Sequence, residues 1–213
     1  MKPSILYEDK AILVCVKPQG LATQTKRVSE SDLVSILKNH ICINEHQKRE
    51  PYLAVIHRLD QPVEGILALA KTPAAARELN KQLTGSGFEK HYRARLSCRP
   101  KRDHDTLICY MIKDGMANRS RICSPDTPGA KKAVLHYQVV NQQDNIITVK
   151  IKLETGRHHQ IRVQMADLGC PIIGDTKYNP HPYPTDTPCP LALCACQLEF
   201  THPVTRKPLT FSI

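Results

Sequence analysis

The sequence predicts an α+β protein built on a mixed, mainly antiparallel sheet with flanking helices. Short apolar runs with the two-residue alternation of strands recur along the chain, whereas only a few segments have helical spacing. Strands and helices do not alternate regularly as they do in βαβ proteins. Because 213 residues suit one large domain, we expect residues 1–213 to form a single domain.

The N-terminal part predicts a strand followed by a helix. Ala11–Val16 is an apolar run that ends at the breaker Lys17–Gly20, which is typical of a buried strand. Ser31 can cap a helix, whose apolar positions with helical spacing are Leu33, Ile36, Leu37 and Ile41. Residues 39–49 are polar and without a usable period, so we expect a connection there.

The most informative stretch follows at residues 52–70. The apolar run 52–56 leads directly into His57-Arg58-Leu59-Asp60, and Pro62 and Gly65 then force a turn before a second apolar run at 66–70. Charged side chains therefore stand where a strand meets a loop, which is where a rigid scaffold can present a reactive group. An isolated Asp at such a place is usually a turn former or a helix cap.

The middle of the chain predicts one helix and four strands. Thr72 caps a helix that has Pro73 at its first position, and Gly85 ends it. Residues 90–96 alternate, which places Tyr92 on the buried face of a strand and two arginines on the other. A core tyrosine would be an equally good reading of Tyr92. Further strands are expected at residues 106–112, 133–140 and 146–153, and a basic loop at 113–132.

A second informative stretch begins at Glu154. Thr155-Gly156 breaks the preceding strand, and Ile161, Met165 and Leu168 then recur at helical spacing until Gly169. Arg162 lies beside the apolar stripe, where arginines commonly have a structural role. A proline-rich loop at residues 180–190 and a strand at 191–200 complete the predicted elements.

The composition favours a polyanionic partner. Thirty Lys and Arg against twenty Asp and Glu give a formal charge of +10, although such an excess can also serve solubility alone. No apolar run approaches the roughly 18 to 20 residues that span a bilayer, and the N-terminus does not resemble a signal peptide. We therefore expect a cytoplasmic protein without a membrane contact. Nine cysteines without a Cys-x-x-Cys pair favour reduced thiols over a metal site.

Several separated motifs resemble those of the RluA-like pseudouridine synthases. His57-Arg58-Leu59-Asp60 with Gly65 is similar to the family's signature. This chain departs from the signature at Val63 and Glu64, where the family usually has Thr and Ser. Lys90-x-Tyr92-x-Ala94 and Thr155-Gly156-Arg157 through Arg162 resemble two further elements, and Gly174-Asp175 with Tyr178 resembles a third. The resemblance extends over nearly the whole chain and implies a pseudouridine synthase fold with a central RNA-binding cleft.

The resemblance also implies an activity and its residues. The enzyme would isomerise uridines of ribosomal or transfer RNA to pseudouridine, without cofactor or metal, and no protein partner is implied. Asp60 would be the nucleophile, Arg162 its ionic partner, and Tyr92 would line the site and help move a proton. Arg58 would fill the space of a flipped-out base. The residues expected to bind RNA are Arg58, His57, Arg157, His159 and Lys90.

Two other functions remain compatible with the sequence. An RNA-binding protein that has lost catalysis would account for the departure at Val63 and Glu64. A glycosidase could use Asp60 and Glu64 as its two carboxylates, but a basic chain without tryptophan is an unusual sugar binder. The sequence does not identify the target RNA or the uridine within it.

Overall fold

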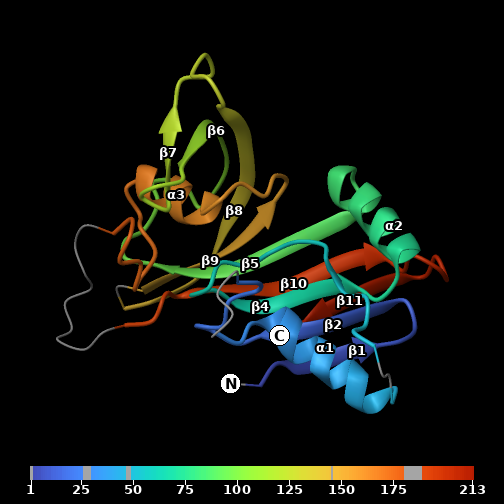
Figure 1. Ribbon diagram of the computed structural model, residues 1–213. Helices are drawn as coiled ribbons and strands as arrows, with labels where there is room; N and C mark the ends of the chain where they lie inside the picture. The colour runs from blue at the N-terminus through green and yellow to red at the C-terminus, as the bar shows by residue number, and fades with distance from the viewer. Residues whose placement is uncertain (1, 26–29, 47–48, 145, 180–188) are drawn as a thin grey trace. The chain divides into compact units, whose positions relative to one another are not determined.

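The computed structural model describes residues 2–25, 30–46, 49–144, 146–179 and 189–213, and Figure 1 shows their helices and strands. The chain divides into two compact units. Unit 1 comprises Met1–Glu89 and Ala195–Ile213, and unit 2 comprises Lys90–Cys194. The expectation of a single domain over residues 1–213 stays a prediction.

Unit 1 contains a mainly antiparallel sheet and two helices. Its strands run in the order β1, β2, β4, β10, with β3 beside β4 and β11 beside β10. The elements are β1 Ser4–Glu8, β2 Ile12–Lys17, α1 Leu33–Asn44, β3 Ala54–Val55, β4 Glu64–Ala70, α2 Pro73–Thr84, β10 Leu193–Thr201 and β11 Pro208–Ser212. The chain enters and leaves unit 2 within β5 and β10.

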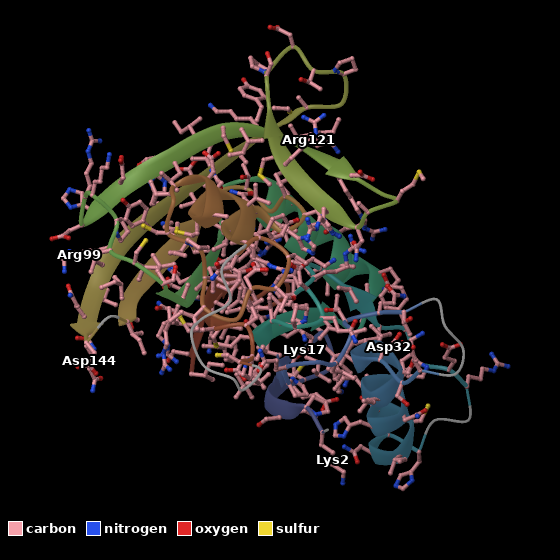
Figure 2. The ribbon with its side chains drawn as sticks, turned by 90° about the vertical axis from the view of Figure 1, so that its left-hand side faces the viewer. Lys2, Lys17, Asp32, Arg99, Arg121 and Asp144 are labelled. Carbon is pink, nitrogen blue, oxygen red and sulfur yellow. The ribbon has the colours of Figure 1, made fainter. Side chains whose placement is uncertain are left out.

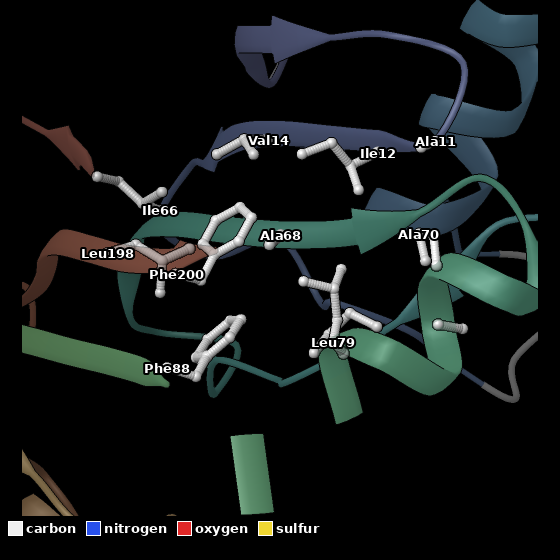
Figure 3. Packing of buried hydrophobic residues seen from close by; sticks show 13 residues of the cluster. Ala11, Ile12, Val14, Ile66, Ala68, Ala70, Leu79, Phe88, Leu198 and Phe200 are labelled. Atoms are coloured by element: carbon white, nitrogen blue, oxygen red, sulfur yellow. The ribbon is translucent and has the colours of Figure 1, made fainter. Parts of the chain in front are cut away.

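One face of this sheet packs against α2, as Figure 3 shows. Alternate residues of β2 and β4 point to this face and pack in one cluster with Leu79 of α2. Phe88 and Phe200 belong to the same cluster, and their rings stack with 5.4 Å between centroids. Thr72 caps α2 as predicted, because its side chain accepts a hydrogen bond from the backbone N–H of Ala75. The helix ends at Gly85, also as predicted.

The start and end of α1 differ from the prediction. The N-cap is Asp32 rather than Ser31, since the Asp32 carboxylate accepts hydrogen bonds from the backbone N–H and the hydroxyl of Ser35. The helix continues to Asn44, so the expected connection at residues 39–49 is wrong in its first half. Burial of Ile41 explains this, because its side chain holds the last turns of the helix in the core.

Unit 2 contains five antiparallel strands in the order β5, β9, β8, β6, β7, with one helix packed on them. Its elements are β5 Phe88–Leu96, β6 His104–Asp114, β7 Arg119–Cys123, β8 Lys131–Gln143, β9 Ile146–Leu153 and α3 Gln160–Asp167. Val163 of α3 packs against Met111 and Ala133.

Three strands were not predicted, and the first of them is the N-terminal strand β1. The expected basic loop at residues 113–132 contains β7, in which exposed Arg119 and Arg121 alternate with buried Ser120. The C-terminal strand β11 was also missed. Most of the expected loop at residues 180–190 lies outside the described residues.

The other predicted strands and α3 are confirmed, and with them the α+β class and its mainly antiparallel sheet. Alternation in β5 buries Tyr92, Ala94 and Leu96 and exposes two arginines, as expected. Among the helices of the described residues, none has the length and apolarity needed to cross a membrane.

Candidate active site

Asp60 lies in unit 1, in the loop between β3 and β4. The backbone N–H of Val63 donates to the carbonyl oxygen of Asp60 at 3.0 Å and closes a turn. On the other side, Leu59 is buried, and its carbonyl oxygen accepts a hydrogen bond of 2.9 Å from the hydroxyl of Thr23. The backbone is therefore fixed both before and after Asp60, and the half-buried side chain starts from a defined position.

Lys17, which is labelled in Figure 2, lies at the end of β2 and is bonded to this loop. Its side chain is fully buried. The ammonium donates to three carbonyl oxygens, those of Leu21 at 2.7 Å and of Pro18 and Gln61 at 3.1 Å. Burial lowers the pKa of Lys17 to about 8, although the negative charges of Asp60 and Glu64 act in the opposite direction.

A second set of bonds joins the same loop to the turn after β2. The backbone N–H of Gly20 donates to the Gln61 carbonyl oxygen at 2.9 Å, and the Gln61 amide donates back to the Gly20 carbonyl at 3.0 Å. The Gln19 side chain donates to the carbonyl oxygen of Pro62 at 2.9 Å. The turn after Lys17 and the Asp60 loop are thus one hydrogen-bonded structure.

The residues that depart from the family signature take different places in this loop. Val63 is buried, so its side chain contributes to the core, whereas Glu64 is exposed at the start of β4. Gly65 follows with φ +134°, and a Cβ there would lie 2.4 Å from the carbonyl oxygen of Ala195. Only glycine fits at Gly65.

The two basic residues before Asp60 have different surroundings. Arg58 is exposed. His57 is half-buried, and its ring meets Phe88 edge-on at 5.3 Å between centroids. Arg58 is therefore more accessible to a ligand in solution than His57.

Tyr92 and Lys90 lie on the buried face of β5, in unit 2. Both are less than one tenth exposed. A Cβ at Gly156 would be 3.8 Å from the Lys90 ammonium, so the Lys90 side chain reaches the Thr155–Arg157 loop. Arg157 of this loop is exposed. Burial lowers the pKa of Lys90 below its ordinary value.

Arg162 is buried in α3 and is paired with Asp175. Its Nε and Nη2 donate to the two oxygens of the Asp175 carboxylate, at 2.8 and 2.7 Å. Burial alone would raise the pKa of Asp175, but the bonds and charge of Arg162 outweigh it and hold the pKa below its ordinary value. The Arg162 guanidinium carbon also lies 5.2 Å from the centroid of the Tyr178 ring, in cation–π range.

His159 completes this cluster as a neutral imidazole. Burial, followed by the positive charge of Arg162, lowers the pKa of His159 to about 3. The Tyr178 hydroxyl lies 2.7 Å from His159 Nδ1 and accepts from the backbone N–H of Ser120 at 2.8 Å. The phenol can therefore donate its proton to Nδ1, which assigns the imidazole proton to Nε2.

The candidate residues thus fall into two groups. Unit 1 brings Asp60 together with Lys17, and unit 2 brings Arg162 and His159 together with Asp175 and Tyr178. Sequence reasoning placed Lys17 in a breaker that ends a strand, and Asp175 and Tyr178 in a motif, but gave none of the three a role. The useful signals were a lysine at the end of an apolar strand and an acid that follows a tight glycine turn.

Comparison with known proteins places this arrangement in a family. The model of the RNA pseudouridylate synthase family matches residues 11–167. The dual-specificity RNA pseudouridine synthase RluA of Yersinia pestis is 35% identical over 210 residues, which cover 97% of this chain and 96% of that protein. Ribosomal large subunit pseudouridine synthase D of Buchnera aphidicola is 28% identical over 228 residues, covering 97% of this chain and 68% of that protein.

A solved structure supports the same fold. Human RNA pseudouridylate synthase domain containing 4 superimposes with a TM-score of 0.81 over 99% of this chain and 87% of that chain, at 24% identity. This likeness shows the pseudouridine synthase fold that the sequence predicted. The family match and the bacterial relatives together show that the chain belongs to the RNA pseudouridylate synthase family and is an RNA pseudouridine synthase.

Proposed function

We propose that Asp60 is the nucleophile of this isomerase. Isomerisation breaks the bond between ribose and the base nitrogen, turns the base and joins the sugar to carbon 5, so nothing is added or removed. A carboxylate can form the transient covalent link, either to the anomeric carbon or to the base ring. The observation that carries this proposal is the hydrogen-bonded loop around Asp60, whose backbone is held on both sides.

Arg162 is the proposed ionic partner of Asp60, and Tyr92 the proposed proton carrier. A carboxylate in a water-poor site needs a cation that favours its charged form. A guanidinium has five N–H donors and Asp175 accepts from two of them, so the proposed bond to Asp60 would use others. The buried Tyr92 would stack on uracil and help remove the proton from carbon 5.

RNA binding is proposed to combine phosphate contacts with base flipping. A stacked uridine is inaccessible, and flipping it out costs a few kcal/mol. The exposed guanidinium of Arg58 would occupy the vacated space, and exposed Arg157 would bind phosphate. Buried Lys90 would order the Thr155–Arg157 loop around the RNA, and buried His159 would order Tyr178. His57, which contacts Phe88, would fix the start of the Asp60 loop.

The proposed substrate is ribosomal or transfer RNA in the cytoplasm. The names of the two bacterial relatives support this class, since one is a dual-specificity RNA pseudouridine synthase and the other a ribosomal large subunit pseudouridine synthase. The nine cysteines are free thiols, which suits a reducing compartment. The net charge of +10 suits a nucleic-acid substrate.

Tritium release from RNA that is labelled at carbon 5 of uridine tests the activity. The purified protein should release tritium from cellular RNA, because carbon 5 loses its hydrogen when the new bond forms. Tight RNA binding without release would instead support a protein that has lost catalysis, and free uracil would support a glycosidase. Mapping pseudouridines in a deletion strain and its parent would then identify the RNA and the uridine.

A further inference from the structure

Two thiols of unit 2 lie in direct contact. Cys98 follows β5 and Cys170 follows α3, and the two residues are 72 positions apart in sequence. Their sulfur atoms are 3.0 Å apart, and the sulfur of Cys98 is also 3.0 Å from the carbonyl oxygen of Gly169. A disulfide has a sulfur–sulfur distance of about 2.05 Å, so a shift of about 1 Å would join them.

The backbone on both sides holds this contact in place. The N–H and the hydroxyl of Ser97 both donate to the carbonyl oxygen of Pro171, at 3.0 and 3.1 Å. Leu96 forms an antiparallel bridge with Ile172. On the other side, the N–H of Cys170 donates to the carbonyl oxygen of Met165 at 3.0 Å. The segments that carry the two thiols are therefore adjacent by virtue of the fold.

The two thiols differ in their access to solvent. Cys98 is exposed, whereas Cys170 is only 4% exposed. Burial, together with the neighbouring Cys98, raises the pKa of Cys170 to about 12. An oxidant in solution therefore reaches Cys98 first, and Cys170 is the protonated neighbour that can react with the product.

We propose that Cys98 and Cys170 are an oxidation site that forms a reversible disulfide when the protein meets a hydroperoxide. The Cys98 thiolate attacks one peroxide oxygen and becomes a sulfenic acid, while the other oxygen leaves as hydroxide or alkoxide. The Cys170 sulfur then attacks the sulfenic sulfur, and its proton leaves with the hydroxyl group as water. The disulfide protects Cys98 from irreversible oxidation to sulfinic acid and is reopened by dithiols.

Mass spectrometry of the full-length protein tests this site. Treatment with a small excess of hydrogen peroxide should give a protein about 2 Da lighter, and dithiothreitol should restore its mass. After alkylation, trypsin should release residues 96–101 linked to residues 163–177, because cleavage does not occur between Arg99 and Pro100. Oxygen addition at Cys98 without this crosslink would overturn the proposal, as would a mass loss that maps to other cysteines.

Substitutions distinguish this pair from the remaining thiols. Cys98→Ser, at an exposed position, should abolish the mass loss, whereas Cys189→Ser at another exposed thiol should leave it unchanged. In Cys170→Ala the sulfenic acid at Cys98 should accumulate and react with a cyclic dione probe. A mass loss that persists at the wild-type rate in Cys98→Ser would contradict the assigned roles. A Cys170→Ala protein without a trapped sulfenic acid would also contradict them.

Discussion

The guanidinium of Arg162 and the carboxylate of Asp175 form a two-bond ion pair inside unit 2, with donor–acceptor distances of 2.8 and 2.7 Å. Both side chains are less than one twentieth exposed. Two parallel bonds fix the plane of a guanidinium as well as its position. Asp175 therefore orients Arg162, which we propose as the partner of the nucleophile.

Removal of Arg162 should reduce both stability and activity. Arg162→Met leaves the Asp175 carboxylate buried without its cation, and breaking a buried pair in this way typically costs about 3 to 5 kcal/mol. Urea unfolding would measure the loss, with Arg93→Met at an exposed position of β5 as the control. In the double variant Arg162→Met/Asp175→Leu, part of the stability should return while tritium release stays low; the rest is lost because the Asp175 carboxylate also accepts from the backbone N–H groups of Lys177 and Tyr178. Full activity in the double variant would argue against a catalytic role for Arg162.

Lys17 should give the activity an upper pH limit near 8. Deprotonation of its amine leaves two N–H donors for three carbonyl oxygens, so the Asp60 loop loses a bond. A charge-assisted bond contributes about 1.5 to 3 kcal/mol, so Lys17→Met should lower the rate by about 10- to 160-fold. The variant should also lack the decline in rate above pH 8. Initial rates between pH 6.5 and 9.5 would measure both effects, with exposed Lys10→Met as control.

The contribution of Lys17 to the stability of the folded protein should change with pH in the opposite direction to its contribution to activity. The pKa of Lys17 is about 8 in the folded protein and its ordinary value is 10.5, so the unfolded chain binds more protons between these values. The stability contribution of Lys17 therefore rises with pH across this window. An activity that is lost only together with the folded structure would contradict the role of Lys17 in holding the loop.

His159 should make the protein less stable in mild acid. Its pKa is about 3 in the folded protein against an ordinary 6.5, so the unfolded chain binds the extra proton in between. Stability should fall as pH decreases from 6.5 towards 3, by about 1.4 kcal/mol per pH unit from this group. His159→Asn, which tolerates the left-handed φ of 56°, should lose that slope in urea unfolding. If the free energy of unfolding still falls with the same slope against pH in His159→Asn, the group that causes the slope is not His159. His104→Asn, at an exposed position, is the control.

Arg58 should matter most on folded RNA. If its guanidinium replaces a flipped-out base, Arg58→Ala should lower kcat/KM on a stem-loop by about tenfold more than on an unstructured strand, because only the stem-loop must be opened. Exposed Arg77→Ala on α2 supplies the control for loss of a positive charge. Equal losses on both RNAs would indicate that Arg58 binds phosphate only.

The sequence was most informative where local chemistry decides the structure. The Thr72 cap with Pro73, the alternation around Tyr92 and the glycine after α3 each predicted the element that the structure contains. The two motif-rich stretches also indicated the correct family. These features depend on neighbouring residues, which a sequence displays directly.

The missed features depend on contacts between distant residues. Arg119–Cys123 forms a strand because it pairs with β6 and because its Ser120 is buried against Tyr178 and His158. Lys17 acquires its role from carbonyl oxygens up to 44 positions away, and Asp175 from an arginine 13 positions earlier. Neither the burial of a lysine nor the partner of an acid can be read from residue type and spacing.

The nucleophile assignment is tested most directly by Asp60→Ala in the tritium-release assay, combined with an RNA-binding measurement. We predict that the variant releases no tritium above background while its affinity for RNA stays within a few-fold of the wild-type value. Tritium release at a rate comparable with that of the wild-type protein would contradict the assignment of Asp60 as the nucleophile.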